Sequence, residues 1–345
     1  MSASKMSASN LRVGLVGYGL AGRYFHAPNL VAAGFEIAAI CTRSLDRRGV
    51  AHAEFPKATI VATIDELVEE DLDLIVVASV NEVHAEHALA AIQRGIPVVV
   101  DKPMGRDLYE TERIFNEADL AGVAVSVFYN RIWDSDTLTI KKIVASNEFG
   151  EPIRFESRFE RFRPELTPGA WRENVDQSSG SGLLLDLQTH LVSTALHLFG
   201  PAQLKFASVR TIRGGADDDV LLVLKHDGGV ESYLSASAII GAPGPRIRLN
   251  LRGGSLIVRE LDRQEDLLRK GYRPSGDGWP EPELVSSEAT FHRGDSSIRV
   301  PTIPGDYSAY YRGVRESLLS GSAMPVTRDF VLSVARIIDD AKRWY

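Results

Sequence analysis

The sequence predicts an α/β fold in two parts: a doubly wound parallel sheet, then an α+β domain with an open, predominantly antiparallel sheet. Apolar strands that alternate with helices up to residue 128 indicate the first part. A period-two pattern that begins near residue 153, followed by two hairpin signals, indicates the second part. A chain of 345 residues is long enough for two domains.

Composition narrows the class of protein. The chain is 44% hydrophobic and 25% charged, as in ordinary globular proteins, and its net charge of −7 argues against nucleic acid as a partner. No apolar run is long enough for a membrane span, and the polar segment Met1–Asn10 reads as a disordered leader. The single cysteine, Cys41, is interpreted as a small buried hydrophobe in a reducing compartment, so we expect the cytoplasm.

The first predicted strand, Leu11–Val16, leads into a glycine-rich turn that matches G-x-G-x-x-G, and the strand Ile37–Cys41 closes the unit. Gly17 allows the tight turn, Gly19 lets a pyrophosphate approach, and Gly22 brings the next helix close to the strand. The free amides of that helix would face the phosphates. A glycine-rich turn without a ligand is the alternative. The predicted cofactor contacts in this turn are Gly17, Tyr18, Gly19, Leu20, Ala21 and Gly22.

The end of the second strand indicates which dinucleotide binds. The strand runs into Thr42, Arg43 and Ser44, and no carboxylate appears before Asp46. An acidic residue there would accept the ribose 2′-hydroxyl of NAD, whereas arginine and serine can donate to a 2′-phosphate. The sequence therefore favours NADP over NAD. If Arg43 is only a solvated loop charge, NAD remains possible.

The remaining elements of the first part continue the alternation. Strands are predicted at Thr59–Ala62, Leu72–Ser79, Ile96–Val100 and Val123–Phe128, and helices at Ile64–Glu70, Glu82–Arg94 and Asp107–Ala121, with Asn81 as the cap of the second helix. Ligands in such sheets lie at the carboxyl ends of strands. The candidates there are Ser79, Asn81, His84, Asp101 and Lys102 for the cofactor and Asn130 for the substrate.

The second part reads as one long strand, a helix, two hairpins and two closing helices. The predicted elements are a strand over 153–159, a helix Leu183–Phe199, hairpin strands Val220–Lys225 with Val230–Ser237 and Ile247–Leu251 with Leu256–Arg259, a surface loop Gly271–Glu283, and helices Tyr307–Leu319 and Asp329–Trp344. The predicted boundaries are a dinucleotide-binding domain at 11–128, a second domain at 129–322, and a C-terminal helix at 323–345.

Two motifs carry candidate chemistry. Lys102 follows a strand directly, so its partly desolvated ammonium could hydrogen-bond a reacting oxygen; a plain turn is the alternative. Asp186 and His190 are spaced to share one helix face, where a carboxylate beside an imidazole suits acid/base work near neutral pH. A structural pair is the alternative. A metal site that adds His197 is another, although ligands from one helix do not close a coordination shell, so no metal is expected.

Arginine and tryptophan cluster after the long strand, at Arg161, Arg163, Trp171 and Arg172. Many donors beside one flat apolar face suit a polyhydroxylated ligand. A surface or interface patch would have the same composition.

Together these pieces resemble the Gfo/Idh/MocA family of NAD(P)-dependent oxidoreductases. Three separated motifs agree, at Gly17–Gly22, Asp101–Pro103 and Asp186–His190, and the likeness runs from Leu11 to the last helix. The segments SVFYNRIWDSDTLTIKKI, RFRPELTPGAWRE and LHLFG are most similar to its scyllo-inositol dehydrogenase (NADP) branch. The family more often has Glu at position 101 and usually has Gly where this chain has Gln188, which would place a bulky amide near the site.

The resemblance implies a Rossmann domain and a second domain whose open sheet forms homodimer or homotetramer contacts. It implies that Lys102 bonds the reacting oxygen, that His190 exchanges its proton, and that Asp186 orients His190 or contacts the substrate. The implied activity is hydride transfer between NADP(H) and a cyclic polyol or sugar; NAD use and a non-catalytic NADP-bound sensor are the alternatives. The implied substrate contacts are Lys102, Asn130, Arg163, Trp171, Asp186 and His190.

Overall fold

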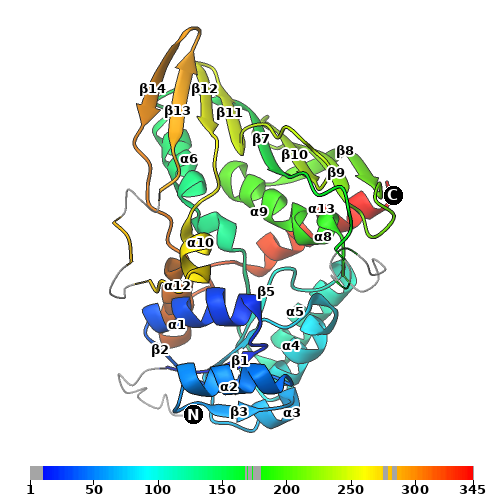
Figure 1. Ribbon diagram of the computed structural model, residues 1–345, viewed down its shortest axis with the longest axis vertical. Helices are drawn as coiled ribbons and strands as arrows, with labels where there is room; N and C mark the ends of the chain where they lie inside the picture. Colours follow the sequence, from blue (N-terminus) through cyan, green and yellow to red (C-terminus); the bar gives the residue numbers. More distant parts are fainter. Residues whose placement is uncertain are drawn as a thin grey trace.

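The structure is a computed structural model that describes residues 11–167, 169, 173, 180–274, 279–281 and 286–344. The predicted leader, Trp171 and Arg172 lie outside these residues, as does part of the predicted loop after Gly271. Figure 1 shows two halves, one built on each of two sheets, with the helix α9 beneath the upper sheet. No helix in the described ranges is long and apolar enough to cross a bilayer.

Six parallel strands form the sheet of the first half, which we call sheet A, in the order β3-β2-β1-β4-β5-β6. The strands are β1 (Leu11–Val16), β2 (Phe35–Cys41), β3 (Thr59–Val61), β4 (Leu74–Val77), β5 (Val98–Asp101) and β6 (Val125–Phe128). The central strands are almost wholly buried, because parallel sheets are covered on both faces. The predicted doubly wound parallel sheet is confirmed.

Helices connect these strands in sequence (Figure 1). They are the π-helical turn η1 (Ala21–His26), α1 (Ala27–Ala32), α2 (Leu45–Glu54), α3 (Ile64–Leu67), the 3-10 turn η2 (Asn81–Val83), α4 (His84–Gln93) and α5 (Leu108–Ala121). The helix predicted at Asp107–Ala121 is α5, and Asp107 caps it by accepting from the amide of Glu110 at 2.8 Å. The prediction that Asn81 caps a helix is wrong, because its amide nitrogen donates to the carbonyl of Gly180 at 2.9 Å instead.

The second half is built on an eight-stranded sheet, which we call sheet B, in the order β14-β13-β12-β11-β7-β10-β9-β8. The strands are β7 (Pro152–Glu160), β8 (Ala202–Arg210), β9 (Asp219–His226), β10 (Glu231–Ser237), β11 (Ile247–Leu251), β12 (Gly254–Val258), β13 (Ala289–Arg293) and β14 (Ser296–Val300). All neighbours are antiparallel except β7 and β10. The open, predominantly antiparallel sheet and both hairpins are confirmed.

One predicted helix of the second half is divided into two, α8 and α9, in the region that carries Asp186 and His190. The helices here are η3 (Asn130–Trp133), α6 (Ser135–Ser146), α8 (Leu183–Asp186), α9 (Gln188–Phe199) and α10 (Gln264–Arg269). The predicted single helix Leu183–Phe199 is interrupted at Leu187. The amide of His190 donates to the carbonyl of Leu187 instead of continuing the α-helical ladder, and Lys102 Nζ donates to the carbonyl of Asp186 at 2.7 Å.

The last two helices, α12 (Ser308–Ser320) and α13 (Arg328–Lys342), pack against the first half. Tyr311 of α12 has its ring 5.3 Å from that of Phe128, at the end of β6. The hydroxyl of Ser126 donates to the carbonyl of Val326 at 3.0 Å. These contacts fix the edge strand β6 of sheet A against the C-terminal segment that follows sheet B. Cys41 is buried, as expected, and burial raises the pKa of its thiol to about 11.

Candidate active site

The glycine-rich turn has the geometry that a dinucleotide requires. Gly17 has a φ of +93°, and a Cβ there would lie 2.6 Å from the carbonyl oxygen of Ala78. A Cβ on Gly22 would lie 1.9 Å from the carbonyl oxygen of Gly17, so the helix follows closely on the strand. At Gly19 the nearest atom to a Cβ is Nη1 of Arg47, at 3.6 Å. The turn is therefore open where a pyrophosphate would approach, and the residues present fit NAD(P).

Arg47 is a candidate cofactor contact that sequence reasoning missed. It lies in the first turn of α2, where Ser44 accepts a hydrogen bond from its backbone amide at 3.4 Å. Arg43 is exposed at the carboxyl end of β2, and Thr42 is buried beside it. Two arginines therefore come from this loop and helix end. A helix starting after Ser44 would have been a signal for this contact, because it places Arg47 about one helical turn from Arg43.

Lys102 and Asp186 meet across the two halves. Nζ of Lys102 lies 2.8 Å from Oδ1 of Asp186 and 2.7 Å from its carbonyl oxygen. The side chains are 12% and 23% exposed, so the pair is largely shielded but still reachable from the cleft. An ammonium held at the carboxyl end of β5 lies where ligands bind in open α/β sheets. The pair supplies a fixed donor for a reacting oxygen.

Asp101 is held beside Lys102 by a contact from the first helical turn. Its carboxylate accepts from the amide of Lys102 at 2.8 Å and lies 3.7 Å from Nε2 of the fully buried His26. Nδ1 of His26 lies 2.5 Å from the hydroxyl of Tyr311 on α12. Burial works to raise the pKa of Asp101, but His26 and Lys102 together lower it. Asp101 is therefore an anion that supports Lys102 from the side of sheet A.

His190 is buried among cations. Desolvation lowers the pKa of its imidazole well below 6.5, and Lys102, Arg131 and Arg246 lower it further. Its Nδ1 finds no hydrogen-bond partner among the described residues, and no carboxylate is among the groups that shift its pKa, so the predicted carboxylate–imidazole pair with Asp186 does not form in this structure. The break at Leu187 and the bonds to Lys102 turn Asp186 toward the other half of the molecule. A neutral His190 can accept a proton near pH 7.

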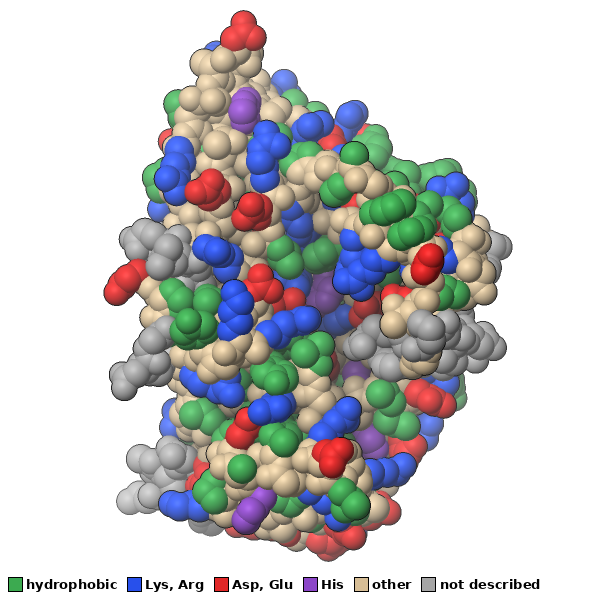
Figure 2. All heavy atoms as spheres, viewed as in Figure 1, with side chains coloured by type: hydrophobic (Ala, Val, Ile, Leu, Met, Phe, Trp, Pro, Cys, Tyr) green, Lys and Arg blue, Asp and Glu red, His purple; other side chains and the backbone are tan. Residues whose placement is uncertain are grey.

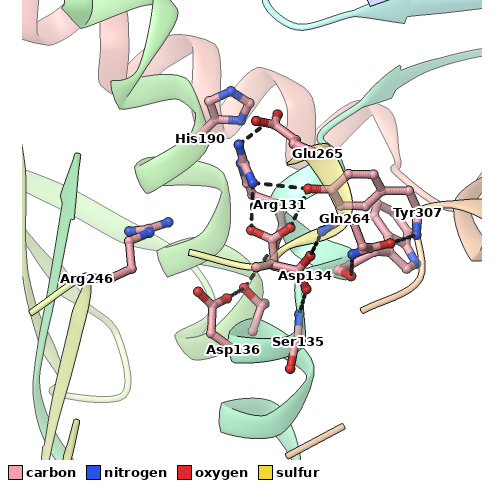
Figure 3. Close-up of polar contacts among 12 residues, drawn as sticks. Arg131, Asp134, Ser135, Asp136, His190, Arg246, Gln264, Glu265 and Tyr307 are labelled. Carbon is pink, nitrogen blue, oxygen red and sulfur yellow. Dashed lines mark hydrogen bonds and ion pairs between the residues drawn. The ribbon is translucent and has the colours of Figure 1, made fainter. Parts of the chain in front are cut away.

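Aromatic and cationic side chains from the second half surround His190. The ring of Phe159 lies 6.0 Å from that of His190, and Cζ of Arg246 lies 4.0 Å from the centre of the Phe159 ring. Cζ of Arg131 lies 5.7 Å from the centre of the same ring. Figure 3 shows the guanidinium of Arg131 close to His190. Figure 2 shows side chains of both charges around the hollow between the two halves. Phe159, Arg131 and Arg246 were not among the predicted site residues.

Comparisons with known proteins agree with this geometry. The model of the oxidoreductase family with an NAD-binding Rossmann fold matches residues 11–129, and that of the GFO/IDH/MocA C-terminal domain matches residues 137–257. The scyllo-inositol 2-dehydrogenase (NADP(+)) IolW of Bacillus subtilis (strain 168) is 34% identical over 98% of this chain and 94% of its own length. The chain belongs to the Gfo/Idh/MocA family. It is therefore an oxidoreductase with an NAD(P)-binding Rossmann domain.

Two further comparisons extend the match. An uncharacterised oxidoreductase of Escherichia coli (strain K12), YdgJ, is 34% identical over 96% of this chain and 95% of its own length. The structure of the oxidoreductase yvaA from Bacillus subtilis superposes with a TM-score of 0.88 at 34% identity, covering 98% of this chain and 97% of that one. The likeness therefore spans both halves of the fold and not only the nucleotide-binding half.

Within this Gfo/Idh/MocA fold, three predicted cofactor residues use their side chains elsewhere. Tyr18 is buried and its hydroxyl donates to Glu54, so only its backbone faces the phosphate site. The ring of His84 is enclosed, with Nδ1 2.7 Å from the carbonyl oxygen of Pro103 and Nε2 3.1 Å from that of Ser79. The amide of Asn81 donates to the carbonyl of Gly180. The side chains of His84 and Asn81 therefore connect backbone segments. Motif position predicted their location but not the direction of their side chains.

The other predicted residues fall around the cleft. Ser79 places its hydroxyl 3.0 Å from Nδ1 of His87, and Asn130 is buried at the start of η3. Leu20 is 45% exposed and Ala21 partly buried, both at the open start of η1. Arg163 is exposed, with its amide donating to the carbonyl of Ala238.

Two sequence alternatives can now be assessed. The expectation that Gln188 places its amide near the site is wrong. Its Nε2 donates instead to the carbonyls of Val220 and Leu234 in sheet B. The metal alternative fails on position, since Nε2 of His197 lies 3.0 Å from Nζ of Lys141. In the described part of the chain, no three His, Cys, Asp or Glu side chains gather as metal ligands would.

Proposed function

We propose that this protein transfers a hydride reversibly between NADP(H) and a secondary alcohol of a cyclic polyol or sugar. The observation that carries the proposal is the contact between Lys102 of the first half and Asp186 of the second, at 2.8 Å. It puts a fixed ammonium at the carboxyl end of β5, near the neutral imidazole of His190. The Bacillus subtilis relative, whose name specifies scyllo-inositol and NADP(+), supports the substrate class and the cofactor.

Each residue then has a distinct task. The dinucleotide that the turn Gly17–Gly22 would hold would supply the acceptor for the hydride of the carbinol carbon. Lys102 donates a hydrogen bond to the carbinol oxygen and stabilises the negative charge that develops on it. His190 accepts the hydroxyl proton, because its lowered pKa leaves it unprotonated near neutral pH. Asp186 holds Lys102 in place from the second half, a positioning task rather than the orientation of His190.

A screen of polyols and aldoses for NADP reduction, followed by nicotinamide absorbance, tests the proposal. We expect turnover with at least one ring polyol and its loss in Lys102→Ala, with NADPH binding nearly intact. Loss of both together would make Lys102 structural. A non-catalytic NADP-bound sensor is the rival, and tight NADPH binding with no turnover on any polyol or aldose would favour it.

The preference for NADP rests on Arg43 and Arg47. Titrating wild type with NADPH and NADH gives the preference, and Arg43→Ala and Arg47→Ala should weaken NADPH binding about tenfold each while sparing NADH. Lys57→Ala, at an exposed position of the same half, is the matched control. Equal weakening of both cofactors would instead place these arginines at the shared pyrophosphate.

We also propose a homodimer or homotetramer formed through the outer face of sheet B. Helix α9 packs on β7, β9 and β10 from one side, and on the strands of this sheet Leu221 and Ile298 remain 36% and 57% exposed. Exposed apolar patches on a protein surface mark sites of contact with other proteins. Sedimentation of wild type and Ile298→Asp tests this, and a wild-type monomer would contradict it.

A further inference from the structure

Glu265, at the start of α10, brings a second carboxylate toward the cleft from the second half. One oxygen lies 2.8 Å from Nη2 of Arg131, and the side chain is 18% exposed, whereas Arg131 is only 5% exposed. Figure 3 shows this carboxylate pointing toward Arg131 and the ring of His190. A carboxylate with one oxygen held and the side chain still open to the cleft can accept a further hydrogen bond.

Arg131 is itself fixed by buried partners. Nη1 lies 3.2 Å from Oδ2 of Asp134 and 3.1 Å from the hydroxyl of Tyr307, and that hydroxyl donates to Oδ1 of Asp134 at 2.7 Å. Asp134 and Tyr307 are both fully buried or nearly so. The guanidinium that holds Glu265 therefore has little freedom to move.

The backbone beside Glu265 is fixed by a second set of bonds. Asp262 accepts from the amide of Ser135 at 2.7 Å, which joins α10 to α6. Gln264 donates to the carbonyl of Trp133 at 3.2 Å and accepts from the amide of Tyr307 at 2.8 Å. Such a preorganised acceptor loses little side-chain entropy when a ligand binds.

Glu265 and Asp186 act on the charge of the same guanidinium. Arg131, which holds Glu265, is one of the cations that lower the pKa of His190. Burial and Arg163 lower the pKa of Arg161, while both Asp186 and Glu265 act on that guanidinium in the opposite sense. Arg161 therefore lies within electrostatic reach of both carboxylates.

Each cation that acts on His190 has an acidic partner of its own. Lys102 faces Asp186, Arg131 faces Asp134 and Glu265, and the carboxylate with the largest effect on the pKa of Arg246 is Asp136. An anionic ligand would meet cations that are already paired with carboxylates, and it would be repelled by Asp186 and Glu265. A neutral ligand with several hydroxyls would instead find acceptors and donors in matched positions.

We propose that Glu265 accepts a hydrogen bond from a substrate hydroxyl remote from the reacting carbinol, and selects neutral polyols against sugar acids. This inference rests on the proposed function of the same cleft. Arg131 acts through Glu265 as a positioning residue, and Glu265 touches the substrate.

The first test compares Glu265→Gln with Asp266→Asn, which removes a carboxylate from the next, exposed position of the helix. With the neutral polyol that the wild type oxidises fastest, we expect KM to rise about tenfold to a hundredfold in Glu265→Gln, the cost of a hydrogen bond to a charged acceptor. The kcat should stay within about threefold, because the reacting atoms are untouched. Asp266→Asn should match wild type, and an unchanged KM in Glu265→Gln would overturn the proposal.

Selectivity separates this role from a purely structural one. D-glucose and D-glucuronate differ in the carboxylate at C6, so their ratio of kcat/KM measures discrimination against an acid. We expect the wild type to favour the neutral sugar, and Glu265→Gln to reduce that preference about tenfold. An unchanged ratio would leave Glu265 as the counter-ion of Arg131 only. Glu265→Asp, which keeps the charge, should keep the preference.

A binding measurement decides the case independently of turnover. The NADPH-loaded protein is titrated with scyllo-inositol and with D-glucuronate in a calorimeter. Weaker binding of scyllo-inositol to Glu265→Gln, with no turnover in any variant, would support this inference while the proposed hydride transfer fails. Equal affinity of the wild type for the two ligands, or binding of neither, would overturn this inference.

Discussion

The two halves of the molecule bring side chains to the same cleft by different means. Lys102 and Asp101 of the first half stand at the end of β5, so the chain itself places them where ligands bind. Glu265 and Arg131 of the second half lie far apart in the sequence and meet through an ion pair. The cleft therefore has one wall fixed by strand direction and one wall fixed by side-chain contacts. Substitutions in the first wall should mainly lower kcat, and substitutions in the second should mainly lower the free energy of unfolding.

The wall made by sheet A should carry the largest catalytic effect. Lys102→Ala removes the ammonium that lies 2.8 Å from Asp186, and we expect kcat to fall about 10²- to 10⁴-fold, the range for a positioned proton donor or acceptor. The Kd for NADPH should change by less than about threefold, because the glycine-rich turn is untouched. Steady-state kinetics and cofactor titration measure both. Lys142→Ala, an exposed lysine on α6, is the control.

The wall made by the second half should show the largest effect on stability. Burial raises the pKa of the fully buried Asp134, and Arg131 opposes that rise; Arg131→Met removes this cation, and we expect the free energy of unfolding to fall by about 3–5 kcal/mol. Arg131→Met with Asp134→Leu should recover most of that loss, since no buried charge remains unpaired. Urea denaturation measures both variants. A double variant as unstable as the single one would mean that packing, and not charge, fixes this wall.

This contrast also explains what the sequence could predict. The turn Gly17–Gly22 and Lys102 follow local rules, because a strand end sets both backbone and position. The break at Leu187 depends on Lys102 taking the carbonyl of Asp186, a contact across 84 residues that no local pattern encodes. For the same reason the sequence did not predict Glu265 as a site residue, because its contact with Arg131 joins distant parts of the chain. The local sequence shows only two acidic residues after Gln264.

His190 belongs to the second wall and should make the fold sensitive to acid. Its pKa is lowered in the folded state, so below 6.5 the unfolded chain binds more protons than the folded one. Its contribution is therefore complete above pH 6.5 and is lost as pH falls toward the folded-state pKa, by about 1.4 kcal/mol per pH unit.

His190→Gln should remove that part of the slope when urea midpoints are measured between about pH 7 and pH 5. His52→Gln, at an exposed position of α2, should leave the slope unchanged. Other buried histidines, such as His84, also have a lowered pKa, so the slope should become shallower rather than vanish. A slope identical to that of wild type would show that the folded protein tolerates a protonated His190.

Substitution of Tyr18 should have the smallest effect on stability. Tyr18 belongs to the first wall, but its side chain is fixed by a side-chain contact, as in the second wall. Its hydroxyl donates to Glu54, and Nη2 of Arg23 lies 2.6 Å from the same carboxylate. Tyr18→Phe removes one bond while Arg23 still neutralises Glu54, so we expect a loss of about 1 kcal/mol in unfolding free energy. Tyr109→Phe, at an exposed site, should cost nothing measurable. The Kd for NADPH should not change, since the hydroxyl points away from the phosphate site; a tenfold weaker Kd would mean that side-chain contacts, and not the backbone alone, also set the nucleotide wall.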